Sequence, residues 1–193
     1  MKEINCAHII SRFLLTTPIA SHRTPPHPKR RSAVMMLISD SPNGARVLLC
    51  KRASHLRHHP SQLCFAGGKQ EREDPTLEHT ALRELHEELN IPAKQVKVIG
   101  RLPEISTLGE VVISPYLGYL KPGTRWQIDQ NEVDNAFFIP FSTLSERRNW
   151  RSITVERDHK PLTFAGLQTE QGLLWGATER IINQFLHQLG LIS

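Results

Sequence analysis

Two hydrophobic patterns alternate along this 193-residue chain. Apolar residues spaced three and four positions apart predict helices over residues 6–16, 76–89 and 177–189. Apolar runs bounded by turn-forming residues predict strands over 33–39, 45–51, 63–65, 96–102, 111–120, 136–139, 153–157 and 162–165. Since strands outnumber helices, we expect an α/β (α+β) fold class, with helices on both faces of a mixed sheet.

Turn-forming residues mark the boundaries of these elements. Asn43-Gly44 predicts a hairpin turn with positive φ at both residues, and residues 158–160 join a second hairpin. Asn90 tolerates a left-handed cap and Pro92 forbids continuation, so the middle helix ends there. The proline-rich run 24–28 is typical of a linker. We therefore expect an N-terminal helix and linker over residues 1–30 and one globular domain over 31–193.

Composition excludes several classes of protein. An apolar content of 39% suffices for one sizeable core, and no 18-residue apolar run could cross a membrane. Arg12 interrupts the N-terminal apolar stretch, which argues against a secretory signal and favours a cytoplasmic location. Three widely spaced cysteines, Cys6, Cys50 and Cys64, indicate neither a disulfide framework nor a zinc site.

Charge is distributed unevenly along the chain. The formal net charge is +5, with basic clusters at 22–31 and 51–59 and an acidic cluster at 71–88. This arrangement suits a polyanionic substrate brought to a metal, although a solvated basic surface explains the first cluster equally well. We expect no specific nucleic-acid partner, because the chain carries no recognised binding motif for one.

The strongest chemical signal lies on the middle helix. Glu84, Glu87 and Glu88 fall within an arc of about 100°, because positions three and four apart are helical neighbours. Three crowded carboxylates repel one another unless a cation binds them, and their hard oxygens suit Mg²⁺ or Mn²⁺. Arg83 lies four residues before Glu87 and could orient it by a charge-assisted hydrogen bond.

The segment before the helix strengthens this hypothesis. Gly67-Gly68, expected as a turn, lets the backbone approach closely, and the loop 71–74 could fold back towards the helix. The alternative is a solvated face, since an isolated pair of glutamates is more often surface than metal site.

Residues 68–91 resemble the signature box of the Nudix hydrolases, which ends in Arg-Glu-apolar-x-Glu-Glu. The run Arg83-Glu84-Leu85-His86-Glu87-Glu88 matches each defined position. Arg83 lies one residue further from Gly68 than the general spacing, the first glutamate of the box falls near Asp74, and Asn90 replaces a glycine. The resemblance implies a Nudix-type α/β/α sandwich.

A second segment is similar to the coenzyme A diphosphatase branch of that family. Residues 48–57 and 62–68 follow its apolar-apolar-x-x-Arg and Phe-Pro-Gly-Gly patterns, and Trp175-Gly176 precedes the last helix as it does there. Ser61 replaces the usual glycine of the branch and Ala66 its proline.

The resemblance implies a role for each matched residue. Glu84 and Glu88 are expected to be metal ligands, and Glu87 a further ligand or the base that accepts a proton from the attacking water. Arg83 would orient the cluster. The expected substrate-binding residues are Arg52, Arg57, Gly67 and Gly68.

Three hypotheses about function remain open. The first is a coenzyme A diphosphatase, with a small nucleotide-linked molecule as substrate and a homodimer as a possible assembly. The second is a Nudix hydrolase of a dinucleotide or a damaged nucleotide. The third is a non-catalytic binding module, which predicts that the carboxylates have been lost. Zinc binding by His55, His58 and His59 is disfavoured because the pattern lacks a fourth ligand.

Overall fold

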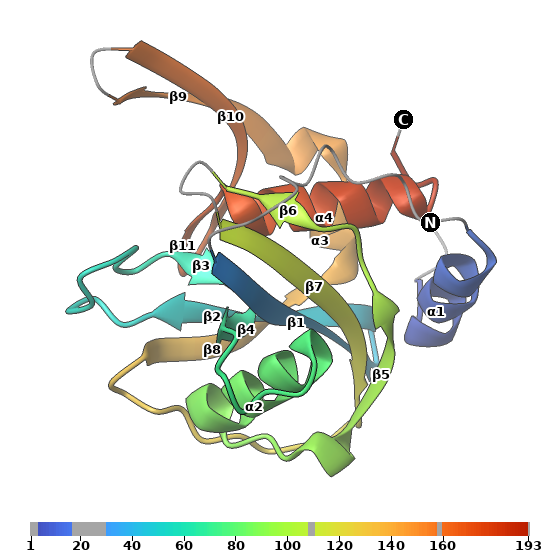
Figure 1. Ribbon diagram of the computed structural model, residues 1–193. Coiled ribbons are helices and arrows are strands. Elements are labelled where there is room, and N and C mark those ends of the chain that lie inside the picture. The colour runs from blue at the N-terminus through green and yellow to red at the C-terminus, as the bar shows by residue number, and fades with distance from the viewer. Residues whose placement is uncertain (1–3, 17–29, 108–110, 158–159, 193) are drawn as a thin grey trace.

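The computed structural model describes residues 4–16, 30–107, 111–157 and 160–192 (Figure 1). The helices are α1 (Cys6–Leu15), α2 (Leu77–Leu89), α3 (Phe141–Ser145) and α4 (Ala177–Gln188), and the 3-10 turns are η1 (Ala93–Gln95) and η2 (Arg147–Asn149). The strands are β1 (Arg30–Ser41), β2 (Gly44–Arg52), β3 (Leu63–Cys64), β4 (Ala66–Lys69), β5 (Val96–Arg101), β6 (Ile105–Ser106), β7 (Val111–Leu120), β8 (Val133–Pro140), β9 (Trp150–Arg157), β10 (Lys160–Thr169) and β11 (Gly172–Leu174).

A mixed sheet forms the centre of the molecule. Its main path runs β3-β2-β1-β7-β5, while β4 pairs with β1, β6 with β7 and β8 with β2. The central pair β1 and β7 is parallel, and the other pairings are antiparallel. A three-stranded sheet, β11-β10-β9, carries a hairpin that extends away from this body (Figure 1). The prediction of a mixed α/β fold is confirmed.

The central sheet separates two hydrophobic cores. Alternate residues of β1 face opposite ways, so Met35 and Leu37 pack with Leu85 of α2, whereas Met36 and Ile38 belong to the other core. That second core also contains α1 and α4, which contribute Cys6, Ile9, Phe13, Ile181, Ile182, Phe185 and Leu186. The molecule therefore has helices on both faces of its sheet (Figure 1).

Two local predictions differ from the structure. Gly67 and Gly68 lie inside β4, paired with Val34 and Ala33 of β1, and do not form a turn. In the β1–β2 hairpin only Gly44 has positive φ, at 92°, while Asn43 does not. Pro42 and Asn43 form the two-residue connection, and Gly44 alone takes the left-handed conformation that glycine adopts without steric cost.

The N-terminal helix packs on the domain. Asn5 caps α1 by accepting a hydrogen bond from the backbone N–H of His8, and the backbone N–H of Cys6 donates to Asp40 on β1. The predicted linker 24–28 and most of the first basic cluster lie outside the described residues. The division of the chain at residue 30, into an N-terminal helix and linker and a globular domain, remains a prediction. Within the described ranges, no helix is long and apolar enough to cross a membrane.

Candidate metal centre

Helix α2 is capped at both ends, and its C-terminal cap is the residue that the sequence indicated. The side chain of Thr76 accepts a hydrogen bond from the backbone N–H of His79, and Asn90 ends the helix in the left-handed conformation, at φ 53°. Leu85 and Leu89 are fully buried against the sheet. The opposite side of α2 presents the charged residues.

Arg83 is held by a loop that folds back on the helix. Its Nε and Nη2 donate to the two oxygens of Asp74, each over 3.1 Å, and Nη2 also donates to the backbone oxygen of Lys69. Asp74 further accepts from the hydroxyl of Thr80. The bonds from Arg83 hold the pKa of Asp74 well below its usual range. The prediction that the loop 71–74 returns to the helix is confirmed.

The fixed guanidinium reaches two box glutamates. Nη1 of Arg83 donates to Oε2 of Glu87 over 2.7 Å, which confirms the predicted contact, and Nη2 donates to Oε1 of Glu84 over 3.1 Å. Glu87 is about half exposed (49%), whereas Glu84 is largely buried (13%). Arg83 therefore orients two carboxylates with different access to solvent.

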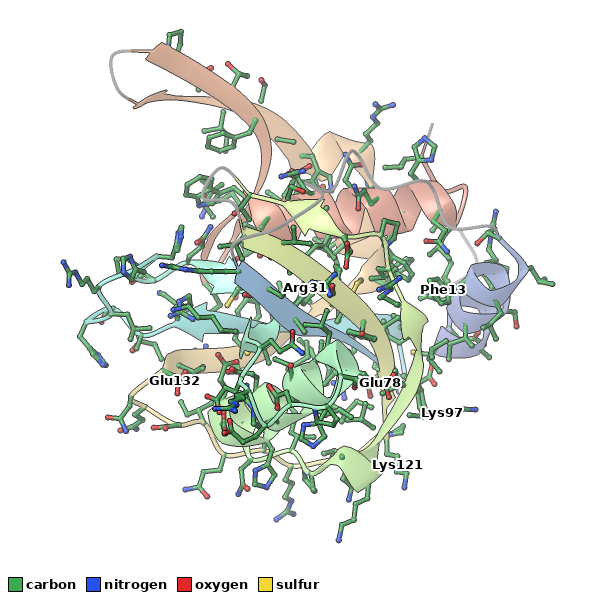
Figure 2. All side chains as sticks on the ribbon, in the orientation of Figure 1. Phe13, Arg31, Glu78, Lys97, Lys121 and Glu132 are labelled. Atoms are coloured by element: carbon green, nitrogen blue, oxygen red, sulfur yellow. The ribbon has the colours of Figure 1, made fainter. Side chains whose placement is uncertain are left out.

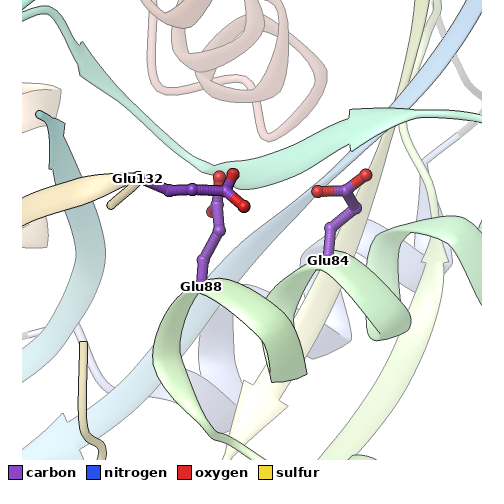
Figure 3. A group of neighbouring side chains, drawn as sticks. All are labelled: Glu84, Glu88 and Glu132. Atoms are coloured by element: carbon purple, nitrogen blue, oxygen red, sulfur yellow. The ribbon is translucent and has the colours of Figure 1, made fainter. Parts of the chain in front are cut away.

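Three carboxylates converge beside this arginine. Glu84, Glu88 and Glu132 each place an oxygen within 4.8 Å of the others (Figure 3). In the described part of the chain, this is the one group of histidine, cysteine and acidic side chains with such spacing. The structure thus brings together two of the three predicted ligands, and it places Glu132 beside them in the position expected for Glu87. The ligand roles themselves remain predictions.

The burial of Glu88 gives this cluster its electrostatic character. Glu88 is 2% exposed, and its Oε2 accepts a hydrogen bond from the backbone N–H of Gly67 over 3.2 Å. Desolvation, and then the nearby charge of Glu84, raise the pKa of Glu88 to about 8. Desolvation also raises the pKa of Glu84. These carboxylates are hard oxygen donors whose negative charges repel one another, so the cluster fits a divalent cation.

Both glycines of β4 are required by this packing. A Cβ on Gly68 would lie 2.3 Å from Oε1 of Glu84, and one on Gly67 would lie 2.3 Å from the backbone oxygen of Ala33. The expectation of close backbone approach is confirmed, but the approach is made by a strand. Gly68 makes space for the carboxylate of Glu84, and Gly67 for the neighbouring strand.

Glu132 comes from a segment that the sequence analysis did not single out. The loop between β7 and β8 runs along the C-terminal end of α2, where the backbone N–H groups of Gln127 and Asp129 donate to the carbonyl oxygens of Leu89 and Glu88. Figure 2 shows Glu132 at the other end of α2 from Glu78. The only local sequence signal for Glu132 is an acidic loop immediately before a strand, and this signal is weak.

The predicted substrate residues occupy the neighbouring strand and loop. Arg52 ends β2, and its positive charge acts on Cys64 and Glu88, partly opposing the rise that burial causes in the pKa of each. Arg57 is exposed on the loop that follows. In that loop Ser61 has φ 58°, a left-handed conformation that explains why the coenzyme A diphosphatase branch usually has glycine at this position. His59, two residues earlier, has φ 55°.

The three tryptophans and the histidines of the loop after β2 lie outside the carboxylate cluster. Trp126 packs edge-on against Phe138, the indole N–H of Trp150 donates to the backbone oxygen of Leu144, and Trp175 stacks on Phe164. His58 and His59 are exposed. Gly176 adopts φ 73° and ψ −134° immediately before α4, a conformation that a side chain would hinder.

The fold and this acidic cluster define a class of protein, and comparison with known proteins identifies the family. The family model described as NUDIX domain matches residues 29–158. The Nudix hydrolase NudL of Salmonella dublin is 31% identical over 184 residues, which cover 95% of this chain and 94% of that protein, and its counterpart in Salmonella newport shows the same values. The chain belongs to the Nudix family, in a NudL-like branch, and is a Nudix hydrolase.

Solved structures agree on the fold. A MutT/nudix family protein from Enterococcus faecalis superposes with a TM-score of 0.58 at 15% identity, covering 96% of this chain and 70% of that one. The protein DR0079 from Deinococcus radiodurans gives a TM-score of 0.55 at 15% identity, covering 84% and 88%. Nudix hydrolases generally use divalent metal ions, and the carboxylates of α2 and the β7–β8 loop suit such an ion.

Proposed function

We propose that the protein uses Mg²⁺ or Mn²⁺ to hydrolyse the diphosphate bond of coenzyme A or a derivative, releasing 3′,5′-ADP and 4′-phosphopantetheine. The observation that carries the metal-dependent chemistry is the convergence of Glu84, Glu88 and Glu132. The choice of substrate is supported by the resemblance of residues 48–57 and 62–68 to the coenzyme A diphosphatase branch.

Glu84, Glu88 and Glu132 are the ligand set that we propose. When bound, a divalent cation neutralises the diphosphate and lowers the pKa of a water molecule. The backbone N–H of Gly67 fixes the direction of Glu88, and Arg83 fixes that of Glu84. Because the three groups come from two elements already packed together, little reorganisation is needed on binding.

Glu87 fits the alternative role of proton acceptor. It stands outside the group of three, is half exposed, and has one oxygen engaged by Arg83. In our proposal the other oxygen receives the proton of the attacking water, while the hydrogen bond from Arg83 holds the carboxylate in place. Arg52 and the exposed Arg57 would contact the phosphates of the substrate.

Glutamine substitutions test the ligand set. Glu84→Gln, Glu88→Gln and Glu132→Gln should each weaken Mg²⁺ binding, measured calorimetrically, and lower metal-dependent turnover by at least about a hundredfold. Glu78→Gln is the matched control, since Glu78 is an exposed glutamate on the same helix. Glu87→Gln should lower turnover while retaining Mg²⁺ affinity. Wild-type Mg²⁺ affinity in the Glu132→Gln variant would remove Glu132 from the set.

A substrate panel tests the choice of coenzyme A. Coenzyme A, an oxidised and an acylated derivative, and dinucleotides are compared by kcat/KM, with released 4′-phosphopantetheine quantified. We expect coenzyme A or a derivative to be preferred, and Arg52→Gln to raise KM more for it than for dinucleotides. Equal kcat/KM across the panel would favour the second hypothesis, a Nudix hydrolase of another nucleotide.

A further inference from the structure

The loop between β2 and β3 is closed on itself at its base. It comprises residues 53–62 and carries the exposed Arg57, and it leaves the sheet at the end where β8 begins (Figure 1). The backbone N–H of Arg52 donates to the carbonyl oxygen of Gln62 over 3.0 Å. This bond closes the β2–β3 loop but does not set its position relative to the carboxylates of the candidate metal centre.

Two further hydrogen bonds attach the β2–β3 loop to the segment that carries Glu132. The backbone N–H of Ala53 donates to the carbonyl oxygen of Glu132 over 2.9 Å, and the N–H of Ser54 donates to Oδ2 of Asp134 over 3.0 Å. Ala53 is fully buried, whereas Asp134 is exposed. The start of the loop is therefore bound to the residues on both sides of Val133, immediately beside a proposed metal ligand.

An irregularity in the sheet gives Asp134 its position. Lys51 of β2 pairs with Asn135 of β8, but the next residue, Arg52, pairs with Val133. Asp134 is thus an extra residue on β8, without a partner in the register, as in a β-bulge. Because a bulge changes the direction of the side chain of its extra residue, the carboxylate of Asp134 can accept a hydrogen bond from the loop.

The charge of Asp134 does not explain its place beside this loop. The segment 51–59 is basic, and the substrate that we propose is a diphosphate, so a neighbouring carboxylate weakens substrate binding through its charge alone. The hydrogen bond to Ser54 has the opposite effect, since it holds the loop in one position before the substrate binds and so lowers the cost of ordering it. Because the two effects differ in sign, substitutions can separate them.

We propose that Asp134 is a positioning residue for substrate binding, which holds the β2–β3 loop so that Arg57 and the metal centre meet the same diphosphate. This inference rests on the proposed function. Asp134 is not a member of the carboxylate cluster, and it acts through the backbone of Ser54. The backbone N–H of Glu132 is held separately by the carbonyl oxygen of Asp129, so loss of Asp134 should alter the loop and leave the metal ligand in place.

Three variants separate the hydrogen bond from the charge. Asp134→Ala loses both, Asp134→Asn loses the charge but keeps an acceptor oxygen, and Ser54→Ala keeps the donating backbone N–H and is the matched control. For the nucleotide that the substrate panel favours, Asp134→Ala should raise KM about three- to tenfold while kcat changes less than about twofold. Asp134→Asn should have a wild-type or lower KM, and Ser54→Ala should match the wild type.

Trypsin digestion with mass spectrometry tests the loop without hydrolysis of any nucleotide. Cleavage after Arg57 should be about threefold or more faster in Asp134→Ala than in the wild type, Asp134→Asn and Ser54→Ala, with calorimetric Mg²⁺ affinity unchanged within about twofold. Wild-type KM or wild-type cleavage in Asp134→Ala, equal KM changes in the alanine and asparagine variants, or a parallel loss of Mg²⁺ affinity would overturn the proposal. Failure of the ligand set appears instead in Glu132→Gln, and failure of the coenzyme A assignment in the panel.

Discussion

Acidic residues of the same helix-and-loop unit serve opposite purposes because their partners differ. Asp74 is satisfied by Arg83 and Thr80, which keep its charge and hold the loop on the helix. Glu88 is equally buried but accepts one backbone hydrogen bond and faces Glu84. The first carboxylate stabilises the fold, whereas the second costs stability that a bound cation would recover.

Glu88→Gln should therefore stabilise the metal-free protein at alkaline pH. The pKa of Glu88 lies at about 8 in the folded state and near 4.5 in an unfolded chain, so between these values the folded state binds more protons than the unfolded state. The wild-type free energy of unfolding should fall as pH rises through this window, by on the order of 2–4 kcal/mol. Denaturant titrations in chelator at several pH values measure this fall, which Glu88→Gln should remove and Glu78→Gln should not. Parallel pH profiles for wild type and Glu88→Gln would contradict the assignment.

The two adjacent glycines of β4 give a second prediction at the scale of single residues. In Gly68→Ala the added methyl group meets the movable carboxylate of Glu84, so Mg²⁺ affinity and turnover should fall at least about tenfold while the unfolding free energy changes by less than about 1 kcal/mol. In Gly67→Ala it meets the backbone of β1 at a φ of 153°, so the fold should lose several kcal/mol. Calorimetric Mg²⁺ titration and denaturant unfolding separate the two effects. Equal loss of stability in both variants would refute this division.

At the scale of elements, Asp129 connects the two parts of the candidate metal centre. Its backbone N–H donates to the carbonyl oxygen of Glu88, its own carbonyl accepts from the N–H groups of Glu132 and Val133, and its side chain accepts from Asn131. The turn that presents Glu132 is thus built on the last turn of α2. We infer that Asp129 is a positioning residue.

Asp129→Ala should weaken Mg²⁺ activation more than it lowers kcat at saturating Mg²⁺. The expected rise in the Mg²⁺ concentration for half-maximal activity is about three- to tenfold, because one or two hydrogen bonds that fix the turn are lost. Asp129→Asn keeps an acceptor oxygen and should restore most of the activation. If the alanine and asparagine variants have the same Mg²⁺ dependence as the wild type, the turn does not position Glu132.

The same elements show which features were predictable from the sequence. The boundaries of α2 follow from Thr76 and Asn90, and its buried face follows from the spacing of its leucines, because these are local effects. Glu132 was not predictable in this way. Its place depends on backbone hydrogen bonds from the β7–β8 loop to Glu88 and Leu89, and a backbone group donates whatever its side chain is. Likewise, β6 and α3 are too short for the spacing of their apolar residues to indicate a strand or a helix.

At the scale of the whole molecule, the central sheet places stability and chemistry on different sides. The core that contains α1, α4 and β2 residues such as Val47 has no member of the carboxylate cluster, which lies beside α2 and the second core. Packed interiors transmit strain, but a sheet with fixed register limits how far a deletion on one face displaces the other. The positions of the glutamates should therefore change little when residues of the opposite core are substituted.

Phe13→Ala tests this separation directly. Phe13 is 7% exposed, packs against Phe185 with ring centroids 6.2 Å apart, and lies on the far side of the molecule from Glu132 in Figure 2. Truncating a buried phenylalanine should reduce the free energy of unfolding by about 3 kcal/mol, measured in denaturant with and without Mg²⁺. Mg²⁺ affinity and KM should stay at wild-type values at temperatures where the variant is folded, whereas exposed Leu14→Ala should change neither stability nor affinity appreciably. A loss of Mg²⁺ affinity in folded Phe13→Ala would show instead that the N-terminal helix and the carboxylates are energetically coupled through the sheet.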